Sequence, residues 1–259
     1  MGETAFPLRL WRAARLLWVL VRGVLTILFI FPFCSLPLRR RMKASWSAAL
    51  VGALAIRVEA DLRQAVPGCL IVAIHISWLD IFALNAVQPC AFIAKADVRQ
   101  WPVIGWLAAH NDTVFLRRGS RGHARIINEE IATRLADGQY VGLFPEGTTT
   151  DGTHVLPFHA ALIQPALAAG RPVVPVAVAY YEANGERSLA PRYDGDITMV
   201  ECIRAVLARP RLIARITACP PIGLAGEDRR TVAAEARRAV IAAAGLPPLA
   251  EESAAADAA

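Results

Sequence analysis

The chain has 259 residues, of which 55% are apolar and 19% charged, and its formal charge is +6. This composition excludes a disordered acidic chain, and it argues against a nucleic-acid binder because those proteins are usually polar as well as basic. Apolar and basic residues together favour a membrane surface, where anionic lipids attract Lys and Arg. The five scattered cysteines form no Cys-x-x-Cys pair, so we expect buried thiols in a reducing, cytoplasmic environment.

Residues 1–60 are expected to form a helical segment that associates with a membrane. An apolar stretch, Leu16–Leu38, is interrupted by Arg22 and followed by the basic cluster Arg39–Lys43. The stretch reaches the roughly 20 residues that a bilayer crossing requires only when Arg22 is included. We therefore predict that it enters one leaflet beside a second apolar helix over Ala44–Val58. A single membrane span is the alternative.

Residues 61–249 are expected to form one α/β domain, because short β-rich runs alternate there with helical stretches. The predicted strands are Cys69–Ile74, Ala91–Ala94, Thr113–Leu116, Tyr140–Phe144, Val173–Tyr180 and Leu212–Thr217. The predicted helices are Trp78–Ala86, Val103–His110, Gly122–Ala136, Ala160–Ala169, Ile197–Leu207 and Arg229–Ala244. Several strands are continuous apolar runs, which indicates a mostly parallel central sheet flanked by helices. The Ala-rich residues 250–259 are predicted to be a disordered tail.

A histidine and an aspartate stand five residues apart where the first of these strands ends. His75 follows the strand, Ser77 is predicted to cap the next helix, and Asp80 falls in the first turn of that helix. The imidazole would then lie at the carboxyl edge of the sheet, where open α/β folds bind ligands. A carboxylate on one imidazole nitrogen leaves the other free to act as a base. A core histidine near a helix-start carboxylate explains the same pattern.

A second polar segment, Phe144–Gly152, directly follows another apolar strand. Gly147 would let the backbone approach a ligand closely, and the threonine run that begins with Thr148 and Thr149 supplies hydroxyl and amide donors. Glu146 is expected to face the same edge of the sheet as the histidine. A capped turn rich in Thr, Asp and Gly is the alternative interpretation.

Basic side chains are predicted at two further strand ends, namely Lys95, Arg117 and Arg118. Converging cations at this edge suit a phosphate, and a solvated basic face is the alternative. No group of His, Cys and Glu has the spacing of a zinc site, so no metal is expected. The chain also has none of the glycine-rich phosphate-binding motifs and no G-x-S-x-G motif.

In chain order, these segments resemble the lysophospholipid acyltransferase family, whose bacterial members convert lysophosphatidic acid to phosphatidic acid. The H-x4-D motif of the family is similar to His75–Asp80, and its apolar strand ending in Arg is similar to Val114–Arg118. The F-P-E-G-T motif is present as Phe144–Thr148, and the V-[VI]-P-[VI] strand as Val173–Val176. The resemblance covers roughly residues 69–178.

The resemblance implies transfer of a fatty acyl chain from acyl-CoA or acyl carrier protein to the free hydroxyl of lysophosphatidic acid. His75 would be the general base and Asp80 would orient it, without a metal, a redox cofactor or an acyl-enzyme. Glu146 would position the acceptor or the loop, and Gly147, Thr148 and Thr149 would contact the substrate. Backbone amides near Gly147 or at the helix starting at Ser77 would hold the oxyanion, while the three basic side chains would bind phosphate. The enzyme would work at a membrane surface, at the cytoplasmic face of the inner membrane of a bacterium.

One departure from the family pattern bears on the acceptor. Many members continue F-P-E-G-T with Arg-Ser, and that arginine is implicated in binding the phosphate of the acceptor, whereas this chain has Thr149-Thr150. A subgroup similar to the lyso-ornithine-lipid acyltransferases shows such a variant, and so do ordinary phosphatidate-forming members. Acylation of another lysolipid is therefore an alternative. A hydrolase that uses Ser77 or water, and a non-catalytic membrane-associated module, are the competing hypotheses.

Overall fold

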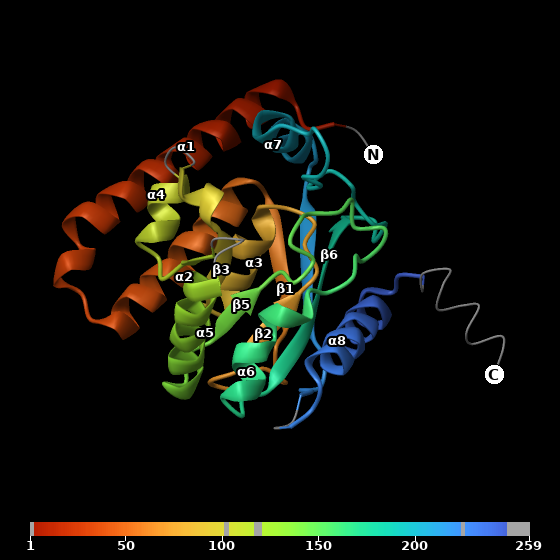
Figure 1. Ribbon diagram of the computed structural model, residues 1–259. Coiled ribbons are helices and arrows are strands. Elements are labelled where there is room, and N and C mark those ends of the chain that lie inside the picture. The colour runs from red at the N-terminus through yellow and green to blue at the C-terminus, as the bar shows by residue number, and fades with distance from the viewer. Residues whose placement is uncertain (1–2, 101–103, 117–120, 224–225, 248–259) are drawn as a thin grey trace.

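A seven-stranded sheet forms the centre of the computed structural model, which describes residues 3–100, 104–116, 121–223 and 226–247 (Figure 1). The strand order is β1-β7-β6-β2-β5-β3-β4, and only the β6–β7 pair is antiparallel. The predicted mostly parallel α/β fold is therefore confirmed. The strands are β1 (Ile56–Asp61), β2 (Leu70–Ala73), β3 (Ala91–Lys95), β4 (Val114–Leu116), β5 (Val141–Leu143), β6 (Val173–Glu182) and β7 (Leu212–Ala218).

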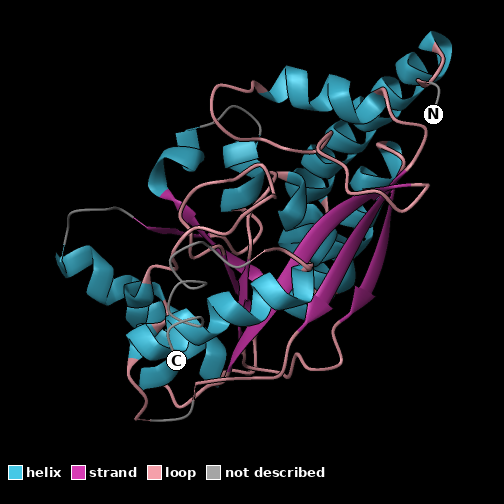
Figure 2. Ribbon diagram, turned by 90° about the vertical axis from the view of Figure 1, so that its right-hand side faces the viewer, coloured by secondary structure: helices cyan, strands magenta, loops and turns pink. Residues whose placement is uncertain are grey.

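Helices lie on both sides of the sheet (Figure 2). On one side α2 packs on α3, and both contact β1; on the other side α5 contacts β5 and α8 contacts β6. The helices are α1 (Phe6–Phe29), η1 (Phe31–Phe33), α2 (Leu36–Ala53), α3 (Leu79–Val87), η2 (Ala96–Gln100), α4 (Ile104–Ala109), α5 (Arg121–Ala136), η3 (Ala160–Leu162), α6 (Gln164–Ala168), α7 (Met199–Leu207) and α8 (Arg229–Ala244).

The central strand β2 determines where the site lies. Its four residues are all buried, and it runs parallel to β5 on one side and to β6 on the other. Val72 stands opposite Leu143 of β5 and Pro175 of β6. Because β2 and β5 end side by side, the segments that follow them emerge at the same edge of the sheet. These segments contain His75 and Glu146.

Two element boundaries differ from the sequence-based expectation. The helix predicted over residues 44–58 ends at Ala53, and β1 begins at Ile56, after Ala55 turns the chain with a positive φ of 58°. The alternating residues of β1 pair with β7. This pairing with a distant segment, which local sequence does not show, favours a strand over a helix. The helix predicted over residues 160–169 is divided into η3 and α6, because a proline stands in the first turn of α6.

The helices α1 and α2 pack closely against each other. Trp46 of α2 donates a hydrogen bond from its indole Nε1 to the carbonyl of Val19 in α1, over 2.7 Å. A Cβ atom on Gly23 would lie 2.6 Å from the same indole nitrogen, so a larger residue does not fit there. Within the described residues, no helix combines the length and the apolar run that a bilayer crossing needs. The predicted tail, residues 250–259, lies outside the described residues.

Candidate active site

The side chains of His75 and Asp80 contact each other at the carboxyl edge of β2. The imidazole Nδ1 lies 3.0 Å from Asp80 Oδ2, and the side chains are 18% and 0% exposed respectively. The ring of Phe144 stacks under that of His75, with centroids 3.9 Å apart and an angle of 12° between the planes. With Nδ1 engaged by the carboxylate and one ring face covered, the second nitrogen, Nε2, is the atom left to react.

The Asp80 carboxylate receives three further hydrogen bonds. Oδ2 accepts from the backbone N–H groups of Ile76 and Ser77, over 2.7 and 2.9 Å. Oδ1 accepts from the hydroxyl of Tyr180 on β6, over 2.7 Å. Burial and the charge of Asp80 hold the pKa of the Tyr180 phenol well above its ordinary value, so it remains a donor. Four donors and no acceptor therefore face the carboxylate, which fixes its orientation toward His75.

The predicted capping role of Ser77 is wrong. The helix α3 begins at Leu79, and no side chain caps it by a hydrogen bond. The side chain of Asp80 folds back onto the amides that precede the helix and so takes the role expected of the serine. Ser77 itself is fully buried, which leaves its hydroxyl without the exposure that a nucleophile needs. The geometry therefore gives no support to a serine hydrolase.

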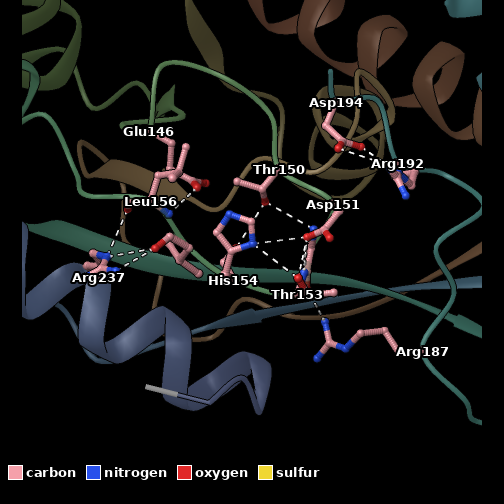
Figure 3. Close-up of polar contacts among 12 residues, drawn as sticks. Glu146, Thr150, Asp151, Thr153, His154, Leu156, Arg187, Arg192, Asp194 and Arg237 are labelled. Carbon is pink, nitrogen blue, oxygen red and sulfur yellow. Dashed lines mark hydrogen bonds and ion pairs between the residues drawn. The ribbon is translucent and has the colours of Figure 1, made fainter. Parts of the chain in front are cut away.

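Glu146 connects the end of β2 to the loop that follows β5. Its Oε1 accepts the backbone N–H of His75 over 2.8 Å, and its Oε2 accepts the backbone N–H of Leu156 over 2.8 Å. The neighbouring Arg237 of α8 donates to the carbonyls of Val155 and Leu156 (Figure 3). Both oxygens of Glu146 thus hold protein backbone, which is the loop-positioning arrangement among the two roles expected from the sequence.

Burial also perturbs the ionisation of Glu146. The residue is 4% exposed, and loss of hydration raises its pKa to about 7, although the two backbone N–H groups act in the opposite direction. The nearby charge of Asp80 raises the pKa further. Glu146 therefore changes charge near neutral pH at a position next to the His75–Asp80 pair.

The loop after Glu146 lies beside the histidine. Gly147 has a φ of 69°, which glycine adopts readily, and its N–H donates to Phe144 over 3.1 Å. The Thr149 hydroxyl donates to the carbonyl of Tyr193, and the N–H of Thr150 donates to the carbonyl of His75 over 2.9 Å. Among the described residues, the N–H groups of positions 148 and 149 have no hydrogen-bond acceptor. These two amides are thus available to a ligand.

A mostly apolar cavity of about 390 Å³ adjoins the histidine. It lies between α2, α3 and α4 on one side and β3 on the other, and the loop residues 147–149 form part of its wall. The residues that line it include His75, Trp46, Trp78, Phe82, Phe92, Ile93, Leu107, Phe144, Thr148 and Lys43. A cavity of this shape and lining accommodates an aliphatic chain next to the imidazole.

Three comparisons with known proteins bear on this site. The family model described as Acyltransferase matches residues 55–179. The chain is 40% identical over 204 residues to the lyso-ornithine lipid O-acyltransferase of Pseudomonas aeruginosa, covering 79% of this chain and 78% of that protein. It is also 40% identical over 179 residues to the 1-acyl-sn-glycerol-3-phosphate acyltransferase of Neisseria meningitidis serogroup B, covering 68% and 70%. The chain belongs to the lysophospholipid acyltransferase family.

A solved structure shares the fold. The 1-acyl-sn-glycerophosphate acyltransferase of Thermotoga maritima superimposes with a TM-score of 0.61 over 92% of this chain and 99% of that one, at 21% identity. At that level of identity the likeness concerns the fold alone. It agrees with the α/β architecture described above.

The remaining residues predicted for this lysophospholipid acyltransferase divide into two groups. Thr148 is exposed at the cavity, while Gly147 and Thr149 are half-buried beside it. Lys95 ends β3, but its side chain lies outside the described part of the structure, as do Arg117 and Arg118. Within the described residues, no group of His, Cys, Asp and Glu could hold a metal ion.

Two residues of the site could not be found from the sequence alone. Tyr180 directly follows the apolar run of β6, and no local pattern connects it with Asp80, which lies 100 positions away. Tyr193 lies in a polar loop whose contact with the threonine run is made only in three dimensions. The pairing register of β6 with β2 could have indicated Tyr180 as a partner of Asp80, because the two strands are adjacent and buried polar groups need hydrogen-bond partners.

Proposed function

We propose that this acyltransferase moves a fatty acyl chain from acyl-CoA or acyl carrier protein to the free hydroxyl of lysophosphatidic acid, with His75 as the general base. The observation that carries this proposal is the buried His75–Asp80 pair, which adjoins an apolar cavity. An imidazole held by a carboxylate on Nδ1 presents Nε2 as a base, and general-base catalysis contributes a factor of about 10²–10⁴.

The proposed reaction needs no acyl-enzyme. As the lysolipid oxygen attacks the thioester carbonyl, Nε2 of His75 takes the hydroxyl proton, and Asp80 stabilises the resulting imidazolium. The tetrahedral intermediate then collapses with cleavage of the C–S bond, and the imidazolium returns the proton to the leaving thiolate. The unpaired N–H groups of Thr148 and Thr149 are the candidates to bind the developing oxyanion. The N–H of Gly147 is less suited, because it already donates to Phe144.

Membrane association is the second part of the proposal. One face of α1 packs inward through Leu16, Val19 and Ile27, yet the opposite face is also apolar. Exposed aromatic side chains on that face include Phe6, Trp11 and Trp18, and Phe33 at the turn before α2 is 89% exposed. Contiguous exposed apolar surface of this kind is typical of membrane contact, and the flanking arginines suit anionic lipid. The lysolipid would then be acylated at the surface where it resides.

A second acceptor, lyso-ornithine lipid, is favoured by one observation. Position 149 is threonine, and its hydroxyl is occupied by the carbonyl of Tyr193, so it offers no cation to a phosphate. The next charged side chain in the loop is the carboxylate of Asp151, which would attract an ammonium group and repel a phosphate.

A single acceptor comparison tests the proposed function. The purified enzyme is supplied with a radiolabelled acyl thioester and with lysophosphatidic acid, lyso-ornithine lipid or no acceptor, and both acylated lipid and free fatty acid are measured. We expect acylated lipid only when a lysolipid is present, and the faster acceptor identifies the head group. Release of fatty acid at full rate without a lysolipid would show a hydrolase and overturn the proposal.

A further inference from the structure

A second cavity lies away from His75, at the opposite edge of the sheet. Its volume is about 400 Å³, and its wall is formed by α2, by the segment before β3 and by the segment before β5. Because these strands run parallel to β2, their starts lie at the edge away from the catalytic histidine. The two cavities share Lys43 in their linings, and the second one contains none of the residues proposed for catalysis.

The lining of this second cavity is basic. It includes Arg40, Arg41 and Lys43 of α2, and Asp112 is its one acidic residue. Within the described part of the chain, the side chains of Arg40 and Arg41 make no hydrogen bond and no ion pair. Tyr140 and Cys90 are its other titratable groups, and burial raises the pKa of both. Two unpaired guanidinium groups at one concave site are suited to bind an anion.

Lys43 places a further cation at the base of the cavity. The residue is 6% exposed, and its Nζ donates to the carbonyl of Cys90 over 2.8 Å and to the carbonyl of Asn111 over 3.3 Å. Loss of hydration lowers the pKa of this ammonium group, while the charge of Asp112 acts in the opposite direction. An anion in the cavity would give the buried ammonium a compensating negative charge.

The neighbouring surface indicates the kind of anion. Pro37 lines the mouth of the cavity, and the residues around it, Phe33, Leu36 and Leu38, are exposed apolar side chains at the turn between α1 and α2. A free inorganic anion would gain nothing from such surroundings. A phospholipid would place its acyl chains along the apolar turn and its phosphate between the arginines.

We propose that this second cavity binds the phosphate of an anionic phospholipid, separately from the site of acyl transfer. The claim goes beyond the proposed function and does not depend on it, because it concerns binding and uses no catalytic residue. Occupancy would hold the turn between α1 and α2 at the headgroup level of the bilayer. The positive charge of α2 would then serve a defined lipid site as well as general attraction to the surface.

The test measures equilibrium binding in the absence of a thioester. The probe is dihexanoyl phosphatidylglycerol below its micelle concentration, compared with dihexanoyl phosphatidylcholine and with inorganic phosphate, by titration calorimetry. The test variant combines Arg40→Gln, at a half-buried position, with Arg41→Gln, at an exposed one; within the described residues neither side chain makes a hydrogen bond or an ion pair. The matched control combines Arg230→Gln and Arg238→Gln at exposed positions of α8, which removes the same two positive charges.

We expect the wild-type and control proteins to bind phosphatidylglycerol with equal affinity and the double variant to bind it at least tenfold more weakly. Phosphatidylcholine and inorganic phosphate should each bind the wild type at least tenfold more weakly than phosphatidylglycerol. Equal affinity of the double variant and the wild type would overturn the proposal. Equal binding of phosphatidylcholine, or of inorganic phosphate, would also overturn it, since the site would then not select an anionic lipid.

Discussion

Replacement of Glu146 by Gln tests the interpretation that this residue is a buried backbone clamp. The substitution keeps the shape of the side chain, but an amide has one oxygen, so it can accept from only one of the N–H groups of His75 and Leu156. Loss of one hydrogen bond lowers the free energy of unfolding by about 1 kcal/mol. The Gln side chain itself adds no pH dependence to the stability of the variant, because Gln does not titrate.

The pH dependence carries the sharper expectation. The folded pKa of Glu146 is raised from 4.5 to about 7, so between these values the unfolded chain binds fewer protons than the folded one. Stability from this group is therefore fully present below pH 4.5 and is lost as the pH rises toward 7. At about 1.4 kcal/mol per pH unit, the wild type should lose about 2.5 kcal/mol relative to Glu146→Gln between pH 5 and pH 8.

Urea unfolding of both proteins at pH 5, 6, 7 and 8, followed by tryptophan fluorescence in one detergent, measures this difference. Other titrating groups act in both proteins and cancel in the subtraction. Glu129→Gln on α5 is the matched control, because that side chain is 66% exposed, and its stability curve should run parallel to the wild type. A curve for Glu146→Gln that also runs parallel from pH 5 to pH 8 would refute the reasoning.

The remaining predictions concern the orientation of Asp80 and the packing of α1. Tyr180→Phe removes the 2.7 Å hydrogen bond to Asp80, so unfolding free energy should fall by about 1.5–3 kcal/mol. The kcat of the Tyr180→Phe variant should fall with little change in KM, and the acid limb of its pH–rate profile should move to higher pH. An unchanged kcat and an unchanged profile would contradict the role of Tyr180 in positioning Asp80. Gly23→Ala should destabilise the fold by about 1 kcal/mol through its clash with Trp46, whereas Gly52→Ala, whose Cβ meets nothing within 4 Å, should stabilise it by about 0.5–1 kcal/mol. Equal melting temperatures of the two alanine variants would show that α1 and α2 are not closely packed.

The sequence predicted secondary structure best where the local apolar pattern matches the burial of the same residues in the fold. The runs that became β2 and β6 are apolar on both faces, so their strand character and their place inside a parallel sheet could be predicted. The strand β1 was missed for two reasons. No proline separates its alternating residues from the helix before it, and the strand that pairs with it, β7, lies about 150 residues later in the chain.

The site was predictable only in part, for the same reason. The spacing of His75 and Asp80, with Asp80 in the first turn of the helix that follows the strand, allowed the prediction that the carboxylate folds back toward the ring. The residues that hold the pair come from elsewhere in the chain, Tyr180 from β6 and Phe144 from the end of β5, and their contacts depend on register and ring orientation. The orientation of Glu146 toward backbone instead of substrate likewise depends on where residue 156 returns, which local sequence does not determine.

The most direct test of the central claim is the rate of acyl transfer by purified His75→Ala. The rate is measured with acyl thioester and lysolipid, beside the wild type and His159→Ala, which replaces an exposed histidine. Circular dichroism and vesicle co-sedimentation show whether each variant remains folded and membrane-bound. We predict that His75→Ala loses at least 10²-fold in kcat, while His159→Ala retains the wild-type rate. A folded His75→Ala protein that acylates lysolipid at a near wild-type rate would contradict the account.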